Sequence, residues 1–279
     1  MKCKFCASTK CYVRKNIVSS LNQETYSLYS CKNCMSFFFS KDQYNISLEN
    51  LYDDLSEKRG NFPEQFSPNK SWQRQVELIY QLMEFTLTSI LDIGCRTGDF
   101  LLHFDPKIKK EGIELSKYFA SIAQNRGLKI HRNFVENIKF DYKFDVVTCY
   151  AILEHLEYPL KFLNKTNTLI NPGGLLVVLI PTHQCLKRKW LDTIGGSWHM
   201  YSPPEHLNFF SRRFLDQYLS KRGFQLIHRF YTSGGMIDPF PKIKIINKVI
   251  KKIIELGDYG WLKKYAFFDH VYSYYLLEK

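Results

Sequence analysis

The sequence predicts an α/β fold, with one domain of about 200 residues preceded by a small cysteine-rich module. Three observations support this prediction. An apolar strand runs into a glycine turn and an apolar helix over residues 89–102. A second strand, ending in an acidic residue, follows over residues 110–116, and two C-x2-C pairs stand within the first 34 residues. The length of 279 residues leaves room for this arrangement but not for three ordinary domains.

The composition is that of a globular protein, with 45% apolar and 24% charged residues, which excludes general disorder. The chain has no run of about 20 apolar residues, so we expect no membrane-spanning helix. Its first residues lack the apolar segment of a signal peptide. We therefore expect a cytoplasmic protein, in which the eight cysteines would not form disulfides.

Residues 1–40 are expected to form a zinc ribbon. Two C-x2-C pairs with 24 residues between them can each place two thiolates on one metal ion. Because protein thiolates fill all four positions, the Zn²⁺ would be structural and would supply folding free energy that so small a segment lacks. Cys11 is a spare thiol and an alternative ligand. The predicted zinc ligands are Cys3, Cys6, Cys31 and Cys34.

A connector or lid is expected over residues 41–69, and the main domain over residues 70–279. The main domain starts with a helix, because apolar residues recur at helical spacing between Gln73 and Leu87. An apolar strand over residues 89–93 follows this helix.

The glycine turn after this strand suits a nucleotide. Gly94 and Gly98 let the backbone turn tightly and approach a ligand. Glu114 lies 20 residues beyond Gly94. At this spacing an acidic side chain accepts hydrogen bonds from ribose hydroxyls.

Residues 91–98 (LDIGCRTG) resemble motif I of the class I S-adenosylmethionine-dependent methyltransferases. Later segments agree with that family in order. Residues 144–156 resemble its fourth strand and the following helix, and residues 171–181 its next turn and fifth strand. Residues 204–211 resemble a segment of one large branch, whose members often carry an N-terminal four-cysteine ribbon. The resemblance covers residues 70–279.

This resemblance implies a doubly wound, Rossmann-like fold with a seven-stranded, mostly parallel sheet and helices on both faces. It also implies S-adenosylmethionine as the cofactor. The middle of the loop, usually glycine, is Arg96, and its side chain could crowd the cofactor, which keeps a degenerate, non-catalytic binding module as an alternative. The implied cofactor-binding residues are Asp92, Gly94 and Gly98 at the methionine end, Glu114 at the ribose, Phe134 and Val135 at the adenine, and Tyr150 beside the methyl group.

Candidates for catalysis cluster in residues 198–209. Methyl transfer from a sulfonium is an in-line displacement, so the protein mainly aligns the reactants and excludes water. A base is needed only for a protonated acceptor. We expect His206 or His199 to act as base or to orient the acceptor, with Glu205 beside them; a loop whose histidines are structural is the alternative. His155 is interpreted as a packing residue of a helix.

The last two strands are expected over residues 224–230 and 271–277. A helical insert over residues 237–268 would separate them. Within it, residues 241–256 carry an isoleucine-rich stripe opposite several lysines. Such a helix can lie on an anionic membrane, although a lid packed on the domain is the ordinary interpretation.

The net charge of +12 is uneven, since +8 of it lies in residues 181–279. A basic last third favours an anionic partner. We expect a methyltransferase that acts on a small molecule such as a sugar, a nucleotide-sugar or a lipid-linked glycan, with possible peripheral contact at the inner face of a membrane. The alternative is an RNA methyltransferase that uses the ribbon and the basic surface.

Overall fold

The computed structural model describes residues 1–40, 66–232 and 269–279. Most of the predicted connector, residues 41–65, lies outside the described residues. The predicted insert over residues 237–268, with its stripe at 241–256, also lies outside them.

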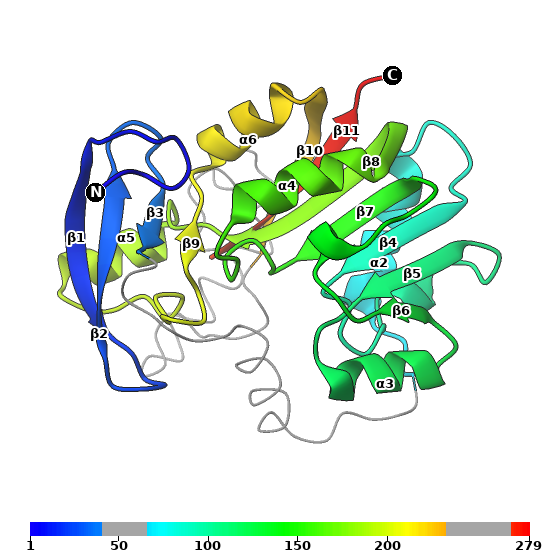
Figure 1. Cartoon of the computed structure of the whole chain (residues 1–279), viewed down its shortest axis with the longest axis horizontal. Helices are drawn as coiled ribbons and strands as arrows, with labels where there is room; N and C mark the ends of the chain where they lie inside the picture. The colour runs from blue at the N-terminus through cyan, green and yellow to red at the C-terminus, as the bar shows by residue number, and fades with distance from the viewer. Residues whose placement is uncertain (41–65, 233–268) are drawn as a thin grey trace, which may run out of the picture.

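The main sheet has seven strands in the order β10-β11-β8-β7-β4-β5-β6 (Figure 1). Every neighbouring pair is parallel except the two that β11 makes. The predicted seven-stranded, mostly parallel sheet is therefore confirmed. The strands are β4 (Ser89–Ile93), β5 (Lys109–Ile113), β6 (Lys129–His131), β7 (Phe144–Tyr150), β8 (Ile170–Pro181), β10 (Phe224–Thr232) and β11 (His270–Leu277).

Helices cover both faces of this sheet, because successive strand residues point to opposite sides. Leu91 belongs to a core with Phe162 of α4 and Leu215 of α6, which lie in front of the sheet in Figure 1. Its neighbour Ile90 packs in a second core with Ile79 of α2. The helices are α2 (Lys70–Leu82), α3 (Lys117–Asn125), α4 (Pro159–Thr168), α5 (Leu186–Thr193) and α6 (Arg212–Ser220), with 3-10 turns η2 (Leu101–His103) and η3 (Val135–Asn137).

Two predicted helices are corrected. After the glycine turn only η2 forms, because Pro106 follows shortly and the chain must enter β5 at Lys109. After β7, residues 151–158 form turns, since Ala151 has a left-handed φ of 54°. The helix there begins only at Pro159. His155 therefore lies in a turn and not on a helix.

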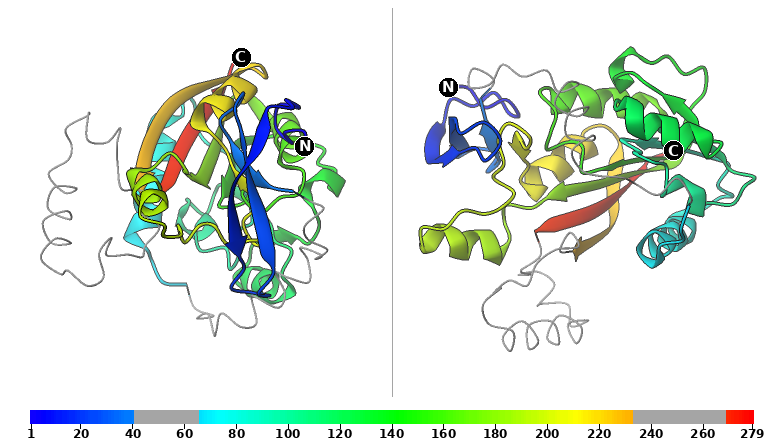
Figure 2. Two further views of the ribbon diagram at one scale, coloured as in Figure 1. Left: turned by 90° about the vertical axis from the view of Figure 1, so that its left-hand side faces the viewer. Right: turned by 90° about the horizontal axis from the view of Figure 1, so that it is seen from below.

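A second, four-stranded antiparallel sheet joins the N-terminal segment to the main domain. Its order is β1-β2-β3-β9. The strand β9 belongs to the segment predicted to hold the acceptor, and its Phe209 pairs with Phe37 of β3. Figures 1 and 2 show these strands beside the main sheet. The strands are β1 (Cys11–Val18), β2 (Thr25–Cys31), β3 (Phe37–Phe39) and β9 (Asn208–Phe209).

Side chains reinforce this junction. The hydroxyl of Ser211 donates to the carbonyl oxygen of Cys34 at 2.5 Å, and a ring nitrogen of His183 donates to that of Met35 at 2.9 Å. A buried core that contains Phe39 and Trp198 lies between the two parts. The N-terminal ribbon and residues 183–211 therefore pack as one unit.

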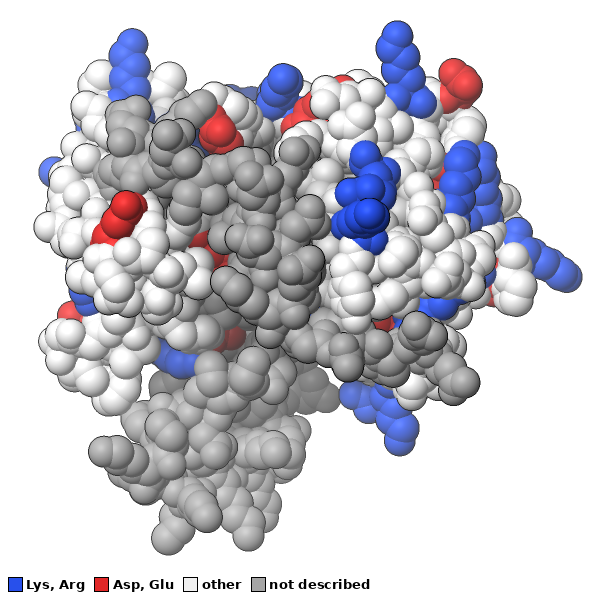
Figure 3. Space-filling model, turned by 60° about the horizontal axis from the view of Figure 1, so that its bottom comes forward, with Lys and Arg blue, Asp and Glu red and all other residues white. Residues whose placement is uncertain are grey.

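The face of the molecule shown in Figure 3 carries scattered positive charge. On the face shown in Figure 3, Lys and Arg side chains stand at several separate places, with Asp and Glu among them. Part of the basic last third, residues 233–268, lies outside the described residues. Among the helices of the described segments, none combines the length and hydropathy that crossing a bilayer requires.

Candidate functional site

A cavity of about 670 Å³ opens at the carboxyl ends of β4, β5 and β7. The strand β4 has β5 on one side and β7 on the other, so the strand order reverses there, which is where ligands bind in open α/β sheets. Eight predicted site residues line this cavity, and Asp92 and Gly98 do not. The eight are Gly94, Glu114, Phe134, Val135, Tyr150, His199, Glu205 and His206.

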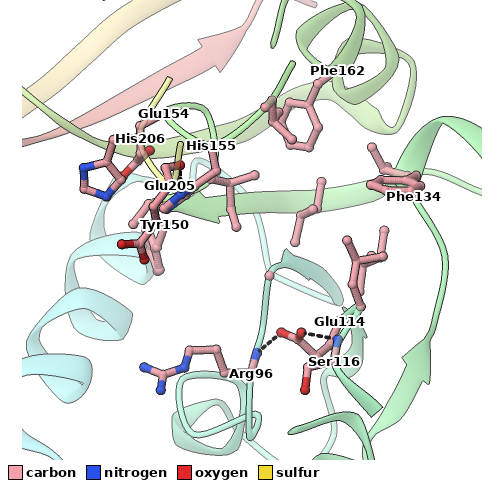
Figure 4. A pocket seen from close by; sticks show the side chains of 18 of the residues that line it. Arg96, Glu114, Ser116, Phe134, Tyr150, Glu154, His155, Phe162, Glu205 and His206 are labelled. Atoms are coloured by element: carbon pink, nitrogen blue, oxygen red, sulfur yellow. Dashed lines mark hydrogen bonds between the residues drawn. The ribbon is translucent and has the colours of Figure 1, made fainter. Parts of the chain in front are cut away.

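Glu114 directly follows β5 at one end of the cavity (Figure 4). Its Oε2 accepts a hydrogen bond from the backbone N–H of Arg96 at 2.9 Å, and its Oε1 accepts one from that of Ser116 at 2.8 Å. Burial raises the pKa of Glu114 above its usual value, while both bonds oppose that rise. The carboxylate is held in one orientation, and its remaining lone pairs can accept from hydroxyl groups.

The glycine turn has the backbone that the sequence predicted. Gly94 and Gly98 have φ values of 80° and 76°, which favour glycine. A Cβ on Gly98 would lie 2.1 Å from Cδ1 of Leu128. The position of Gly98 therefore leaves no room for a side chain beside Leu128.

Asp92 lies beneath the turn. Its Oδ1 accepts a hydrogen bond from Oγ1 of Thr148 at 2.5 Å. Burial raises the pKa of Asp92 to about 7. It connects β4 to β7 below the cavity floor.

Arg96 adopts a left-handed φ of 48°. Its guanidinium lies 4.9 Å from the ring centroid of Phe119 on α3. In Figure 4 the side chain extends away from Glu114. The backbone N–H of Arg96 therefore donates to Glu114, while its side chain lies against Phe119 of α3.

Aromatic side chains line two separate parts of the cavity (Figure 4). Phe134 caps η3, Val135 is its first residue, and both line the cavity. Tyr150 ends β7, and its ring stacks on Trp72 of α2 with the centroids 5.5 Å apart. The flat, apolar surface of Phe134 and Val135 suits a purine base, whereas Figure 4 shows Tyr150 at the other side of the cavity, next to Glu205.

Polar side chains gather at the opposite end of the cavity from Glu114 (Figure 4). The Nδ1–H of His206 donates to the carbonyl oxygen of Met200 at 2.9 Å, and that of His155 to the carbonyl oxygen of Glu205 at 2.8 Å. The two imidazole rings meet edge to face, with centroids 4.8 Å apart. Each neutral ring therefore has Nε2 as its basic nitrogen.

Glu154 and His155 were missed as site residues because the sequence placed them on a helix. Both line the cavity, and burial raises the pKa of Glu154 to about 8. One signal could have found them: they closely follow Tyr150, the last residue of a buried parallel strand.

This polar end is rigidly built. The carbonyl oxygen of Glu154 accepts backbone N–H groups of Leu207 at 2.6 Å and Asn208 at 3.0 Å. The side-chain amide of Asn208 donates to the carbonyl oxygens of Leu153 and Leu156, each at 2.7 Å. The turn after β7 is thus fastened to the segment that carries His206.

His199 lies beside a buried carboxylate. Its Nε2 is 3.3 Å from Oδ2 of Asp269, which also contacts Lys187 at 3.2 Å and His270 at 3.1 Å. Burial lowers the pKa of His199, and the Lys187 ammonium adds to this. Burial alone would raise the pKa of Asp269, but His270 and Lys187 outweigh it and lower that pKa. A neutral imidazole next to a carboxylate can accept a proton.

The four predicted zinc ligands lie together. The sulfur of Cys3 is 3.6 Å from that of Cys34, the sulfur of Cys6 is 3.6 Å from that of Cys31, and all four lie within 4.8 Å of one another. Tetrahedral zinc with Zn–S bonds of about 2.3 Å requires sulfurs about 3.8 Å apart. The donor set and its spacing fit Zn²⁺. Cys11 lies outside this group and donates to a carbonyl.

The two cysteine turns are built alike. The backbone N–H of Ala7 donates to the carbonyl oxygen of Cys3 at 2.9 Å, and that of Met35 to the carbonyl oxygen of Cys31 at 3.0 Å. Ala7 and Met35 both have left-handed φ values, 57° and 59°. Each turn therefore directs its two thiols to the same side.

Comparisons with known proteins indicate the family of the chain. A family model described as a methyltransferase domain matches residues 49–229. An uncharacterized protein of Methanocaldococcus jannaschii is 28% identical over 156 residues, 56% of this chain and 73% of that protein. A ubiquinone biosynthesis O-methyltransferase of Haemophilus ducreyi is 28% identical over 141 residues, 44% of this chain and 57% of that enzyme. The alignment thus spans little more than half of that enzyme.

A solved structure shares the fold. The N-methyltransferase NodS of Bradyrhizobium japonicum, in complex with S-adenosyl-L-homocysteine, superposes with a TM-score of 0.52. The sequences are 14% identical, and the match covers 82% of this chain and all of the other.

Proposed function

Because this chain belongs to the methyltransferase-domain family, we propose that it transfers the methyl group of S-adenosylmethionine to a small polar acceptor such as a sugar, a nucleotide-sugar or a lipid-linked glycan. One observation carries the proposal. A single cavity has Glu114 and the glycine turn at one end and a polar wall around His206 at the other. A donor and an acceptor can therefore meet within it.

The cofactor would lie along the turn, between Phe134 and Tyr150. Glu114 would accept hydrogen bonds from the ribose, and Gly94 would pass close to the methionine part. Phe134 and Val135 would contact the adenine, which leaves the methyl group near Tyr150. Asp92 and Gly98 would act by holding the turn in shape.

His199 is the base in this proposal. The acceptor oxygen attacks the methyl carbon, the carbon–sulfur bond breaks, and the acceptor proton passes to His199. Asp269 orients this imidazole and stabilises the imidazolium that forms. Glu205 and His206 would hold the acceptor in line with the sulfonium.

The four ribbon cysteines would hold a structural Zn²⁺. The ion would fix β2 and β3, and through the β3–β9 pairing it would also fix the acceptor wall. Loss of the ion would therefore affect acceptor binding more than cofactor binding.

The cavity of about 670 Å³ lies within the range of small-molecule sites, about 300–1,000 Å³, and has to hold the cofactor as well, which favours a small acceptor group. The test is a thermal-shift screen of sugars, nucleotide-sugars and RNA in the presence of S-adenosylhomocysteine. A ligand at 100 times its Kd adds about 2.7 kcal/mol, a rise in Tm of roughly 5–10 °C. A shift with RNA only, steeply weakened by salt, would favour the RNA alternative. If calorimetry detects no binding of S-adenosylhomocysteine, the proposed methyltransferase activity is refuted.

A membrane contact through residues 241–256, which lie outside the described residues, is part of the proposal for a lipid-linked acceptor. Liposome flotation of the full chain and of a variant lacking these residues tests it. Equal flotation of the full chain and the variant would contradict membrane contact through these residues.

A further inference from the structure

We propose that Glu154, His155 and His206 form a binding site for a divalent transition-metal ion, such as Zn²⁺, on the acceptor wall of the cavity. One ligand atom from each of the three residues lies within 4.8 Å of the others. This site is separate from the four-cysteine group and offers nitrogen and oxygen in place of sulfur. Its assigned role rests on the proposed function, because the ion would face the acceptor.

Glu154 provides the first argument. Glu154 is only 1% exposed. Its Oε2 has no hydrogen-bond partner in the described part of the chain. A buried carboxylate oxygen without a partner is costly. In Figure 4 this carboxylate lies beside the ring of His206. A cation between them would give this oxygen a partner.

The two histidines provide the second argument. A metal-binding histidine almost always donates its other ring N–H to a carboxylate, a carbonyl or water, which fixes its tautomer and orientation. The Nδ1–H of His155 does so to the carbonyl of Glu205, and that of His206 to the carbonyl of Met200. Both rings therefore have the tautomer in which Nε2 can bind a cation.

The backbone around the three side chains is fixed. Leu207 and Asn208 donate to the carbonyl of Glu154, and the N–H of His206 donates to the carbonyl of Ser202 at 2.9 Å. Around tetrahedral zinc with bonds of about 2.0–2.1 Å, donor atoms lie about 3.4 Å apart. The three donor atoms lie within 4.8 Å of one another, so side-chain rotations would have to bring them closer to bind the ion.

The ligand set indicates the kind of cation and its use. Imidazole nitrogens suit Zn²⁺, Fe²⁺ and Ni²⁺, whereas Mg²⁺ and Ca²⁺ prefer oxygen. Three protein ligands leave a coordination position open to the cavity, as in catalytic zinc sites. An acceptor hydroxyl bound there would lose its proton more readily, and His199 would take that proton while the methyl group moves to the oxygen.

The experiment compares zinc content and Co²⁺ binding in the full-length protein and three variants. Glu154→Gln and His206→Asn each remove one ligand, and His199→Asn changes a neighbouring cavity residue outside the set. We expect the wild type and His199→Asn to hold one more zinc ion than the other two after equilibrium dialysis. Loss of outer partners alone weakens metal sites 10- to 100-fold, so removal of a ligand should cost about 100-fold or more. The comparison cancels any zinc in the ribbon.

Co²⁺ spectra identify the ligands, because thiolate ligands give intense charge-transfer bands and imidazole and carboxylate do not. The expected result is a Co²⁺ signal without these bands that is lost in Glu154→Gln and His206→Asn. Equal metal content and equal spectra in all four proteins would overturn the site. Calorimetry with S-adenosylhomocysteine tests the proposed function separately, since Glu154 and His206 lie away from Glu114. Thermal melts show that each variant is folded.

Discussion

Replacing Glu114 with Gln should weaken the binding of S-adenosylhomocysteine sharply. The carboxylate accepts from the N–H groups of Arg96 and Ser116 with its two oxygens, at 2.9 and 2.8 Å. A Gln amide has one acceptor and one donor, so one of these N–H groups would face a donor. The ribose would also lose a charged acceptor. Hydrogen bonds to charged groups contribute about 1.5–3 kcal/mol, which corresponds to roughly 10- to 150-fold in Kd.

Calorimetry measures this change, and Glu111→Gln is the matched control. Glu111 is also a buried acid of β5, but it binds Lys129 at 3.2 Å and His131 at 2.7 Å and does not line the cavity. We expect this control to keep the wild-type Kd within about twofold while its Tm falls. If Glu114→Gln binds S-adenosylhomocysteine as tightly as the wild type, Glu114 does not hold the ribose.

Three further predictions concern the turn, the base and the ribbon. Gly98→Ala should lower the free energy of unfolding by about 2–4 kcal/mol, because it adds a clash with Leu128 to the cost of the left-handed backbone. Gly127→Ala, which has φ +81° and nothing within 4 Å of its Cβ, should lose only about 1–2 kcal/mol; equal losses in urea unfolding would contradict the steric argument. Because the pKa of His199 lies below its usual 6.5, kcat/KM should fall as the pH drops through that lower value. A His199→Asn variant that keeps this acid limb would exclude His199 as the base. Cys31→Ser should lose the ribbon zinc, lower the Tm and weaken acceptor binding while S-adenosylhomocysteine still binds; unchanged zinc by elemental analysis would refute the ribbon site.

The sequence by itself determined the elements that depend on local chemistry. The strand, the glycine turn and the acid at Glu114 are fixed by backbone freedom and by spacing along the chain, and the structure places them together. The two cysteine pairs likewise predicted four sulfurs that now lie within 4.8 Å of one another. Such patterns can be read because each needs only a few neighbouring residues.

The sequence pattern predicted the wrong secondary structure after Tyr150, where a single backbone angle decides between a helix and turns. The apolar residues after Tyr150 fit a helix, but Ala151 has a left-handed φ and the chain forms turns instead. Glu154 and His155 then face the cavity rather than a helix neighbour. No helical spacing in the sequence reports this.

Only the tertiary structure brought distant segments together. The strand β3 pairs with β9 about 170 residues later, which joins the N-terminal segment to the segment that carries His206. Asp269, the residue before β11, reaches His199, and His206 meets His155 across a gap of about 50 residues. The physical reason is that side-chain packing and strand register in the whole fold set these contacts, and neither is encoded by the spacing of residues along one segment.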